Sequence, residues 1–223
     1  MTKKIIIVGA FLEIIELAED FGYEIVGLID NNRNGLYRNY RILSSDDYVD
    51  ELDQNLKEIS LIITPDIPQK REKLYSYYLS KGFKFSSLIS TSSKISKSAI
   101  INEGTVIQYG VNVSSEVYIG KFVKLNTYCN IMHNSIIGDF TTIAPNAVVL
   151  GNVKIGKNCY IGSNATILPN IEISDNVVVG AGAVVTEDIP PFSIVAGNPA
   201  KILKQFNNSE EIQNYFRSKQ KLK

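Results

Sequence analysis

The single histidine of this sequence, His133, stands among residues that could carry out acyl transfer. Gly151 follows it by eighteen residues, and its backbone can approach a ligand closely because no side chain intervenes. Asn126, in the repeat before His133, adds an amide that can form hydrogen bonds. Acyl transfer needs a base that works near neutral pH and a donor for the developing oxyanion, and a histidine beside an exposed backbone N–H supplies both. A lone histidine at a turn is also commonly a solvated surface residue, and this alternative stays open.

His133 lies in a stretch, Ile95 to Ile189, in which an aliphatic residue returns every six residues without interruption. The sixteen positions are Ile95, Ile101, Ile107, Val113, Ile119, Leu125, Ile131, Ile137, Ile143, Val149, Ile155, Ile161, Ile167, Ile173, Val179 and Val185. Four residues after each of them stands Ala, Cys, Ser, Thr, Val or Ile, and nothing bulky or charged occurs there. Both positions therefore suit the inside of a regular coil.

The third residue after these aliphatic positions is often of a type that tolerates left-handed backbone angles. The residues concerned are Asn134, Asn146, Asn152, Asn158, Asn164, Asn170 and Asn176, with Gly104, Gly110, Gly182 and Asp188. A short strand and one corner every six residues are the signature of a parallel β-helix. Three repeats close a triangular coil, so sixteen repeats predict slightly more than five coils, stacked at a spacing of ~4.8 Å. Separate alternating strands would instead need turn signals every 8–12 residues or so, roughly twice this period.

Composition excludes some classes of function. The chain has 223 residues and a net charge of zero, so it has no basic stripe for nucleic acid or for an anionic membrane surface. The N-terminal sequence MTKKIIIVGAFLEIIELAED turns acidic after a short apolar run, which fits neither a secretory signal nor a membrane span, and a cytoplasmic location is expected. Cys129 and Cys159 fall on small inward positions of different faces, which predicts free buried thiols rather than a disulfide.

Residues 1–89 alternate between strand and helix patterns, which predicts a small parallel sheet with Rossmann-like connections. The expected strands and helices are Lys4–Gly9, Phe11–Phe21, Glu24–Asp30, Asp46–Leu56, Ile59–Thr64, Gln69–Gly82 and Phe83–Leu88, in the order strand, helix, strand, helix, strand, helix, strand. Such sheets bind ligands beyond the carboxyl ends of their strands, here Gly9–Glu13, Asp30–Asn32 and Thr64–Pro68.

The whole chain is thus expected to be an α+β protein of two domains with a terminal helix. Residues 1–89 would form the Rossmann-like domain, residues 90–203 the β-helix and residues 204–223 the helix. The segment PPFSIVAGNPAKIL contains many breakers and is expected to be a loop, and Ser209 is expected to cap the helix in SEEIQNYFRSK.

Two segments of the sequence point to a known family. They are NTYCNIMHNSIIGDFTTIAPNAVVLGNVKIGKNCYIGSNATILPN and VVVGAGAVVTEDIPPFSIVAGNPAK. With them, essentially the whole chain resembles the left-handed β-helix acetyltransferases that modify nucleotide-linked sugars, in particular the sugar N-acetyltransferases of the bacillosamine pathway and the sialic acid O-acetyltransferases. The resemblance implies a left-handed β-helix, acetyl-CoA as co-substrate and a homotrimer.

The resemblance also implies roles for individual residues. His133 would be the general base, the backbone N–H of Gly151 would hold the thioester oxygen, and Asn126 would help to shape the site. The residues implied to contact acetyl-CoA, in a cleft between neighbouring subunits, are Thr142, Gly151, Ser163, Ala181 and, at the CoA phosphates, Lys201.

The sequence departs from the family directly after the histidine, where Asp or Glu is usual and Asn134 stands here. An amide cannot stabilise an imidazolium as a carboxylate would. Asn134 also lines up with Asn152 and Asn170 at a spacing of eighteen residues, so a purely structural role at the corner is an alternative. Without a carboxylate beside it, His133 would be a weaker base, or a carboxylate of the neighbouring subunit would assist it.

The second departure is at the expected nucleotide site, where the family carries a Gly-rich turn with a histidine. Here the turn reads Gly9-Ala10-Phe11-Leu12-Glu13, and Glu13 would repel a diphosphate. The residues expected at the acceptor are Gly9, Ala10, Glu13, Asp30, Asn31 and Arg71, the last as a phosphate partner. The alternative is a domain that has lost nucleotide-sugar binding and only caps the β-helix.

The leading hypothesis is an acetyl-CoA-dependent enzyme that acetylates an amino group of a nucleotide-linked sugar for surface glycan synthesis. The amine must lose a proton to attack the thioester, and His133 can accept it. Sugar O-acetylation and a non-catalytic trimeric β-helix protein are the alternatives. A zinc-dependent carbonic anhydrase on the same β-helix needs several histidine ligands, so the single histidine rules it out. No metal is expected.

Overall fold

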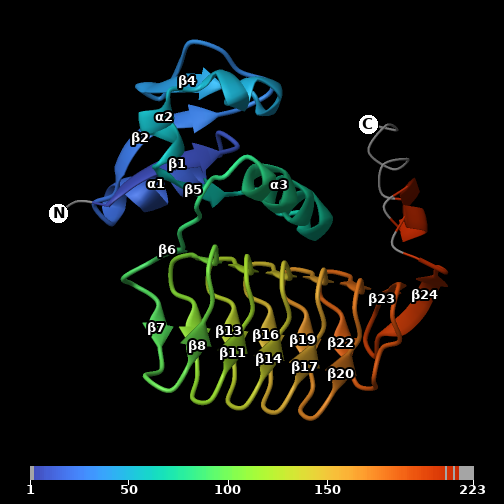
Figure 1. Ribbon diagram of the computed structural model, residues 1–223. Coiled ribbons are helices and arrows are strands. Elements are labelled where there is room, and N and C mark those ends of the chain that lie inside the picture. Colours follow the sequence, from blue (N-terminus) through green and yellow to red (C-terminus); the bar gives the residue numbers. More distant parts are fainter. Residues whose placement is uncertain (1–2, 209, 213, 216–223) are drawn as a thin grey trace.

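The computed structural model describes residues 3–208, 210–212 and 214–215, and it shows a small α/β region followed by a long parallel β-helix (Figure 1). In the α/β region one sheet has the strand order β3-β4-β2-β1-β5. Its elements are β1 (Lys4–Val8), α1 (Leu12–Asp20), β2 (Glu24–Ile29), β3 (Leu36–Tyr37), β4 (Tyr40–Ser44), the 3-10 helix η1 (Asp46–Glu51), α2 (Gln54–Lys57), β5 (Ser60–Ile63) and α3 (Pro68–Ser80). The parallel pairing of β1 with both β2 and β5 confirms the Rossmann-like sheet.

Three details of this region differ from the sequence prediction. The helix predicted at Asp46–Leu56 is divided into η1 and α2. The strand predicted at Phe83–Leu88 is reduced to one bridge between Leu61 and Phe85, because the chain leaves the sheet there and enters the β-helix. The hairpin of β3 and β4 was not predicted, since Arg38 takes a positive φ of 50° in its two-residue turn and arginine gives no signal for such a turn.

The β-helix confirms the six-residue period. Its strands are β6 (Leu88–Ile89), β7 (Lys94–Ile95), β8 (Ile100–Ile101), β9 (Val106–Ile107), β10 (Asn112–Val113), β11 (Tyr118–Ile119), β12 (Lys124–Leu125), β13 (Asn130–Ile131), β14 (Ile136–Ile137), β15 (Thr142–Ile143), β16 (Val148–Val149), β17 (Lys154–Ile155), β18 (Tyr160–Ile161), β19 (Thr166–Ile167), β20 (Glu172–Ile173), β21 (Val178–Val179), β22 (Val184–Val185), β23 (Ser193–Ala196) and β24 (Lys201–Gln205). They form three faces, with β7, β10, β13, β16, β19 and β22 in the six-stranded face, β8, β11, β14, β17 and β20 in the five-stranded face, and the others in the eight-stranded face.

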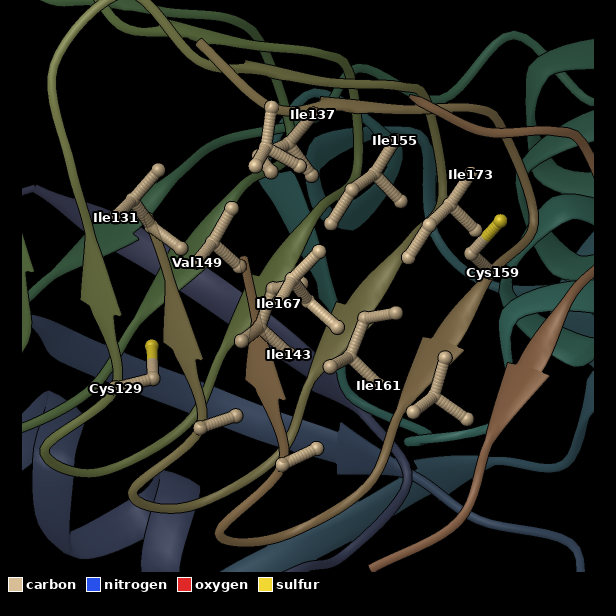
Figure 2. Close-up of a cluster of buried hydrophobic side chains, with 14 of the residues drawn as sticks. Cys129, Ile131, Ile137, Ile143, Val149, Ile155, Cys159, Ile161, Ile167 and Ile173 are labelled. Carbon is tan, nitrogen blue, oxygen red and sulfur yellow. The ribbon is translucent and has the colours of Figure 1, made fainter. Parts of the chain in front are cut away.

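The inside of the β-helix is filled by the aliphatic residues of the repeat. Figure 2 shows Ile131, Val149 and Ile167 of the six-stranded face in one column, opposite residues of the other two faces. Fourteen of the sixteen repeat positions are buried, and only Ile95 and Ile101 in the first coil are partly exposed. Each coil therefore covers the apolar residues of its neighbours, and Ile95 and Ile101 stay partly exposed because the first coil has a stacked coil on one side only.

Both cysteines are free and buried in the described structure, as predicted. Burial raises the pKa of both thiols, that of Cys159 to about 12, so they stay protonated at neutral pH. They pack as small inward residues and have no role in the chemistry considered below.

The predicted asparagine and glycine corners all have positive φ, for example 60° at Asn134 and 72° at Gly104. Asp188 does not, and its carboxylate instead accepts a hydrogen bond from the N–H of Glu172 at 2.7 Å. Four further corners take positive φ although their residue types do not favour it, namely Glu116, Phe122, Tyr128 and Phe140. The side chains of Phe122 and Phe140 are buried against the α/β region, and this packing compensates for the backbone conformation.

The segment after the last repeat contradicts the loop prediction. β23 and β24 pair antiparallel and extend the eight-stranded face. The breakers Gly197 and Pro199, the latter after a cis peptide bond, lie in the turn between these strands, so they do not interrupt either strand. Residues 210–212 and 214–215 are helical, and the expected cap Ser209 lies outside the described residues. Asn208 Oδ1 accepts hydrogen bonds from the N–H groups of Glu210 and Glu211, both at 3.0 Å.

The α/β region packs on the eight-stranded face and on the adjoining corners. Tyr75 of α3 contacts Phe122, with ring centroids 4.5 Å apart, and Phe122 stacks on Phe140 of the next coil at 5.5 Å. Lys124 of β12 is buried between the two parts, where its ammonium pairs with Asp66 at 2.8 Å and lies 3.8 Å from Glu13. Within the described residues, no helix has the length and apolar character that crossing a bilayer requires.

Candidate functional site

His133 lies at a corner between β13 and β14, on the row of corners that joins the six-stranded and five-stranded faces. Its ring is exposed and lies directly over Gly151, which occupies the same corner one coil further on. A Cβ on Gly151 would lie 2.6 Å from His133 Cε1 and 2.7 Å from Nε2, so only glycine leaves room for the ring. The eighteen-residue spacing in the sequence therefore becomes direct contact in the structure.

The backbone N–H of Gly151 is not used by the bonds between coils in the described structure, although Gly151 itself is buried, which differs from the exposed N–H expected from the sequence. The hydrogen bonds between coils on this row use the carbonyl group of the residue at this position, as in the bond from the N–H of Asn152 to the His133 carbonyl at 3.0 Å. For the Gly151 N–H, no acceptor is found among the residues that the structure describes. A base and a backbone donor without an acceptor in the described structure thus lie side by side, the combination that acyl transfer uses, with the His133 ring exposed and Gly151 buried beneath it.

Asn134 contacts the histidine and also forms the corner. Its Oδ1 lies 3.0 Å from His133 Nδ1, and its own φ is 60°. With the amide oxygen as acceptor, Nδ1 carries the proton and Nε2 is left to accept one from a substrate. Asn134 can therefore form the corner of the coil and also hold the histidine in one tautomer.

The remaining residues expected around the acetyl group lie on another row of corners. Asn126, Ser163 and Ala181 all lie where the eight-stranded face meets the six-stranded face. Within one chain they are separated from His133 by the width of the six-stranded face. The structure thus brings His133 together with Gly151 and Asn134, and it places Asn126 apart from them.

Thr142 and Lys201, both expected to contact acetyl-CoA, differ in their exposure to solvent. Thr142 is fully buried, and its hydroxyl donates a hydrogen bond to the carbonyl of Asp66 at 2.6 Å. It serves the contact between the two parts of the chain, so the expectation that it lines an open cleft is wrong. Lys201 is exposed at the start of β24, and its expected contact with CoA phosphates stays a prediction.

A cavity of about 160 Å³ opens at the carboxyl ends of β1, β2 and β5, where the sequence predicted the acceptor. Gly9, Ala10, Asp30 and Asn31 line it, as expected. Asp30 is held by the N–H groups of Ala10 at 2.8 Å and Asn32 at 2.9 Å. Asn31 and Asp46 hold one another, because the Asn31 amide donates to the Asp46 carboxylate and accepts from the Asp46 N–H, both at 2.7 Å.

Glu13 does not point into this cavity. Its carboxylate accepts from Gln108 Nε2 at 3.3 Å and lies near Lys124, so it faces the β-helix. The repulsion of a diphosphate that the sequence suggested is reduced, because a cation and an amide of the β-helix face this carboxylate.

Arg71 is not the phosphate partner that the sequence suggested. Its side chain is buried, and burial lowers the pKa of its guanidinium to about 9, so it stays charged at neutral pH. The guanidinium donates to the carbonyl oxygens of Pro65, Asp66, Phe122, Phe140 and Thr141. Arg71 therefore joins α3 to the β-helix corners and has no donor left for a ligand.

Sequence reasoning missed two cations that line the cavity, Arg33 and Lys70. Arg33 follows β2 in the polar segment NNRNG, and Lys70 lies in the first turn of α3. Their signal in the sequence was weak, since isolated basic residues in a loop and at a helix start are common surface features. Only the folded sheet brings them to one cavity.

With the geometry described, comparison with known proteins becomes informative. A family model described as bacterial transferase hexapeptide (six repeats) matches residues 116–151 and 152–187, which include His133 and Gly151. Residues 116–187 of the β-helix, the hexapeptide domain, therefore resemble this family. No curated protein sequence gives a significant match to the chain.

Solved structures extend the likeness of this hexapeptide domain to the whole chain. The acetyltransferase domain of PglB from Neisseria gonorrhoeae is 26% identical with a TM-score of 0.83, over 91% of this chain and 100% of that chain. GDP-perosamine N-acetyl transferase from Caulobacter crescentus is 23% identical with a TM-score of 0.85, over 92% of this chain and 99% of that chain. The hexapeptide domain and the α/β region together thus resemble left-handed β-helix sugar acetyltransferases.

Proposed function

We propose that this protein transfers the acetyl group of acetyl-CoA to an amino group of a nucleotide-linked sugar used for surface glycans. The observation that carries the proposal is the ring of His133 over Gly151 beside a free backbone N–H. The PglB acetyltransferase domain has also been solved in complex with acetyl coenzyme A, and the Caulobacter enzyme with CoA and GDP-perosamine. Together these support an acyltransferase with a sugar nucleotide as acceptor.

The geometry supports a direct transfer between the two substrates. The acceptor amine passes a proton to His133 Nε2 while its nitrogen attacks the thioester carbon, and the new C–N bond forms. The Gly151 N–H donates to the thioester oxygen, which becomes negative in the transition state. The C–S bond then breaks, and the imidazolium returns the proton to the leaving CoA thiolate. Asn134 holds the Nδ1 proton throughout and so keeps Nε2 directed at the acceptor.

The same geometry also fits a hydroxyl acceptor, as in sugar O-acetylation, because the base and the oxyanion donor serve either nucleophile. The amino sugar is preferred here, since an N-acetyltransferase and an acetyltransferase domain are the relatives with the same overall architecture.

Replacement of the base tests this proposal. His133→Ala should reduce CoA release by ~100-fold or more, with little change in affinity for acetyl-CoA, because general-base assistance contributes about 10²–10⁴-fold and acts on the acceptor. The assay mixes the protein with acetyl-CoA and UDP-, dTDP-, GDP- or CMP-linked amino sugars and measures free CoA.

Lys97→Ala is the matched control, since Lys97 is an exposed residue on the same row of corners two coils before His133. This variant should keep the wild-type rate. If His133→Ala retains more than half of the wild-type rate with a verified acceptor, His133 is a surface residue and the mechanism is wrong.

A further inference from the structure

The turn between β1 and α1 has its backbone donors already engaged. The N–H of Gly9 bonds to the carbonyl of Ile29 at 2.8 Å, that of Ala10 to Asp30 at 2.8 Å, and that of Phe11 to the carbonyl of Gly9 at 2.9 Å. A phosphate cradle needs backbone N–H groups that point at the ligand. Because these three point elsewhere, the turn offers no backbone cradle for an anion, and side chains become the main candidates to hold one.

The two carboxylates that line the cavity are also engaged. Asp30 accepts from two backbone N–H groups and lies 3.5 Å from Arg33 Nη1. Asp46 accepts from the Asn31 amide at 2.7 Å and from the hydroxyl of Tyr78. Their negative charge is therefore directed into the protein, where donors surround it, and less of it faces the cavity.

The two cations enter the cavity from different elements. Arg33 stacks over the ring of Tyr37, with its Cζ 4.4 Å from the ring centroid. Its Nη1 lies 3.5 Å from Asp30, and for Nη2 and Nε no partner is found in the described part of the chain. Lys70 is exposed on the first turn of α3, and no partner of its ammonium is found in the described part of the chain. The planar guanidinium of Arg33 and the ammonium of Lys70, on two sides of one cavity, suit a phosphate group.

We infer that Arg33 and Lys70 hold the phosphates of the acceptor, in place of the backbone of the turn after β1. The inference rests on the proposed function and specifies how the acceptor is bound. It predicts a ligand with a nucleoside diphosphate, and binding that weakens as salt is added, because both cations are exposed.

Direct binding tests the inference without turnover. The probes are UDP, dTDP, GDP and CDP, titrated into the full-length protein by calorimetry at low and high salt, with the corresponding nucleosides as uncharged probes. Arg33→Gln and Lys70→Gln should each weaken the binding of the preferred diphosphate by about tenfold or more, since each removes a charge-assisted hydrogen bond. Both variants should bind the nucleoside as the wild type does.

Arg41→Gln and Lys84→Gln serve as matched controls, because both residues are exposed in the same region and lie outside the cavity. They should leave diphosphate affinity unchanged. The inference is overturned if no diphosphate binds to the wild-type protein, or if Arg33→Gln and Lys70→Gln bind it as tightly as the controls.

The outcome also separates this inference from the proposed function. If diphosphate binding depends on the two cations while no sugar nucleotide releases CoA, the binding site stands and the acetyl transfer is wrong. If CoA is released but neither variant raises the KM for the acceptor, the enzyme stands and the phosphate site is wrong.

Discussion

At the scale of single residues, the contact between His133 and Asn134 would set the strength of the proposed base. The amide oxygen of Asn134 accepts the Nδ1 proton at 3.0 Å, which fixes the tautomer, but it carries no charge. The imidazolium that forms during reaction would gain more from a carboxylate, because hydrogen bonds between charged groups are about twice as strong as neutral ones.

Asn134→Asp should therefore increase the rate of acetyl transfer by about five- to tenfold, in line with the stronger bond between charged groups. Asp is also tolerated at positive φ, so the thermal stability of the variant should change little. Steady-state kinetics and thermal unfolding are the measurements. Asn170→Asp, at the same corner two coils further on with φ of 62°, should show no kinetic gain. A large loss of stability without a gain in rate would show that Asn134 only forms the corner.

At the scale of elements, corner residues of the β-helix also form part of the surface on which the α/β region packs. Phe122 has an unfavourable left-handed backbone conformation, with φ of 53°. The contacts of its ring with Tyr75, Phe85 and Phe140 compensate for this cost. The corner one coil earlier is Gly104, and a Cβ there would lie 2.4 Å from the Phe122 ring. Gly104 thus meets two requirements, the backbone angle and the space for the ring.

A comparison of two glycine corners separates these requirements. Gly182→Ala should destabilise the protein by about 1–2 kcal/mol, the cost of a left-handed Ala, since nothing lies within 4 Å of its added Cβ. Gly104→Ala has the same backbone cost and also displaces the Phe122 ring, which adds about 1–3 kcal/mol. Denaturant unfolding measures both. Equal losses in the two variants would mean that the aromatic cluster adapts without cost.

At the scale of the whole molecule, the two rows of site residues point to a particular assembly. His133 and Gly151 lie along one edge of the six-stranded face, and Asn126, Ser163 and Ala181 lie along its other edge. In a cyclic trimer these edges meet between neighbouring chains if every six-stranded face turns toward the common axis. The outward residues of this face after the first coil, among them Val148, Thr166 and Val184, carry no charge, whereas Lys154 and Glu172 lie outward on the five-stranded face.

The protein should therefore be a homotrimer that Thr166→Arg dissociates. Placing an unpaired charge in each of three interfaces costs several kcal/mol per ion, roughly, and activity should be lost with the assembly. Light scattering and CoA release are the measurements. Glu172→Arg, on the exposed five-stranded face, is the control and should keep the trimer. A wild-type protein that is monomeric at micromolar concentration would contradict both the assembly and a cleft between subunits.

The sequence by itself determined the β-helix, its asparagine and glycine corners and the contact of His133 with Gly151. The period of six residues repeats one local conformation, and eighteen residues make one coil, so stacking neighbours follow from the spacing alone. The parallel sheet of the α/β region also followed from local patterns. Errors arose at Phe85 and Arg38, where one pairing or one turn overrode them, and in the helix predicted at Asp46–Leu56, which is divided in two.

Only the tertiary structure decided what the contacts between the two parts of the chain do. Arg71 is a good phosphate ligand by sequence, yet docking buries it on five carbonyl oxygens, and Thr142 is covered by the loop at Asp66 for the same reason. Arg33 and Lys70 show the opposite case, since folding brings two unremarkable cations to one cavity. No local period encodes contacts between residues far apart in the chain, because such contacts depend on how complete domains pack against each other.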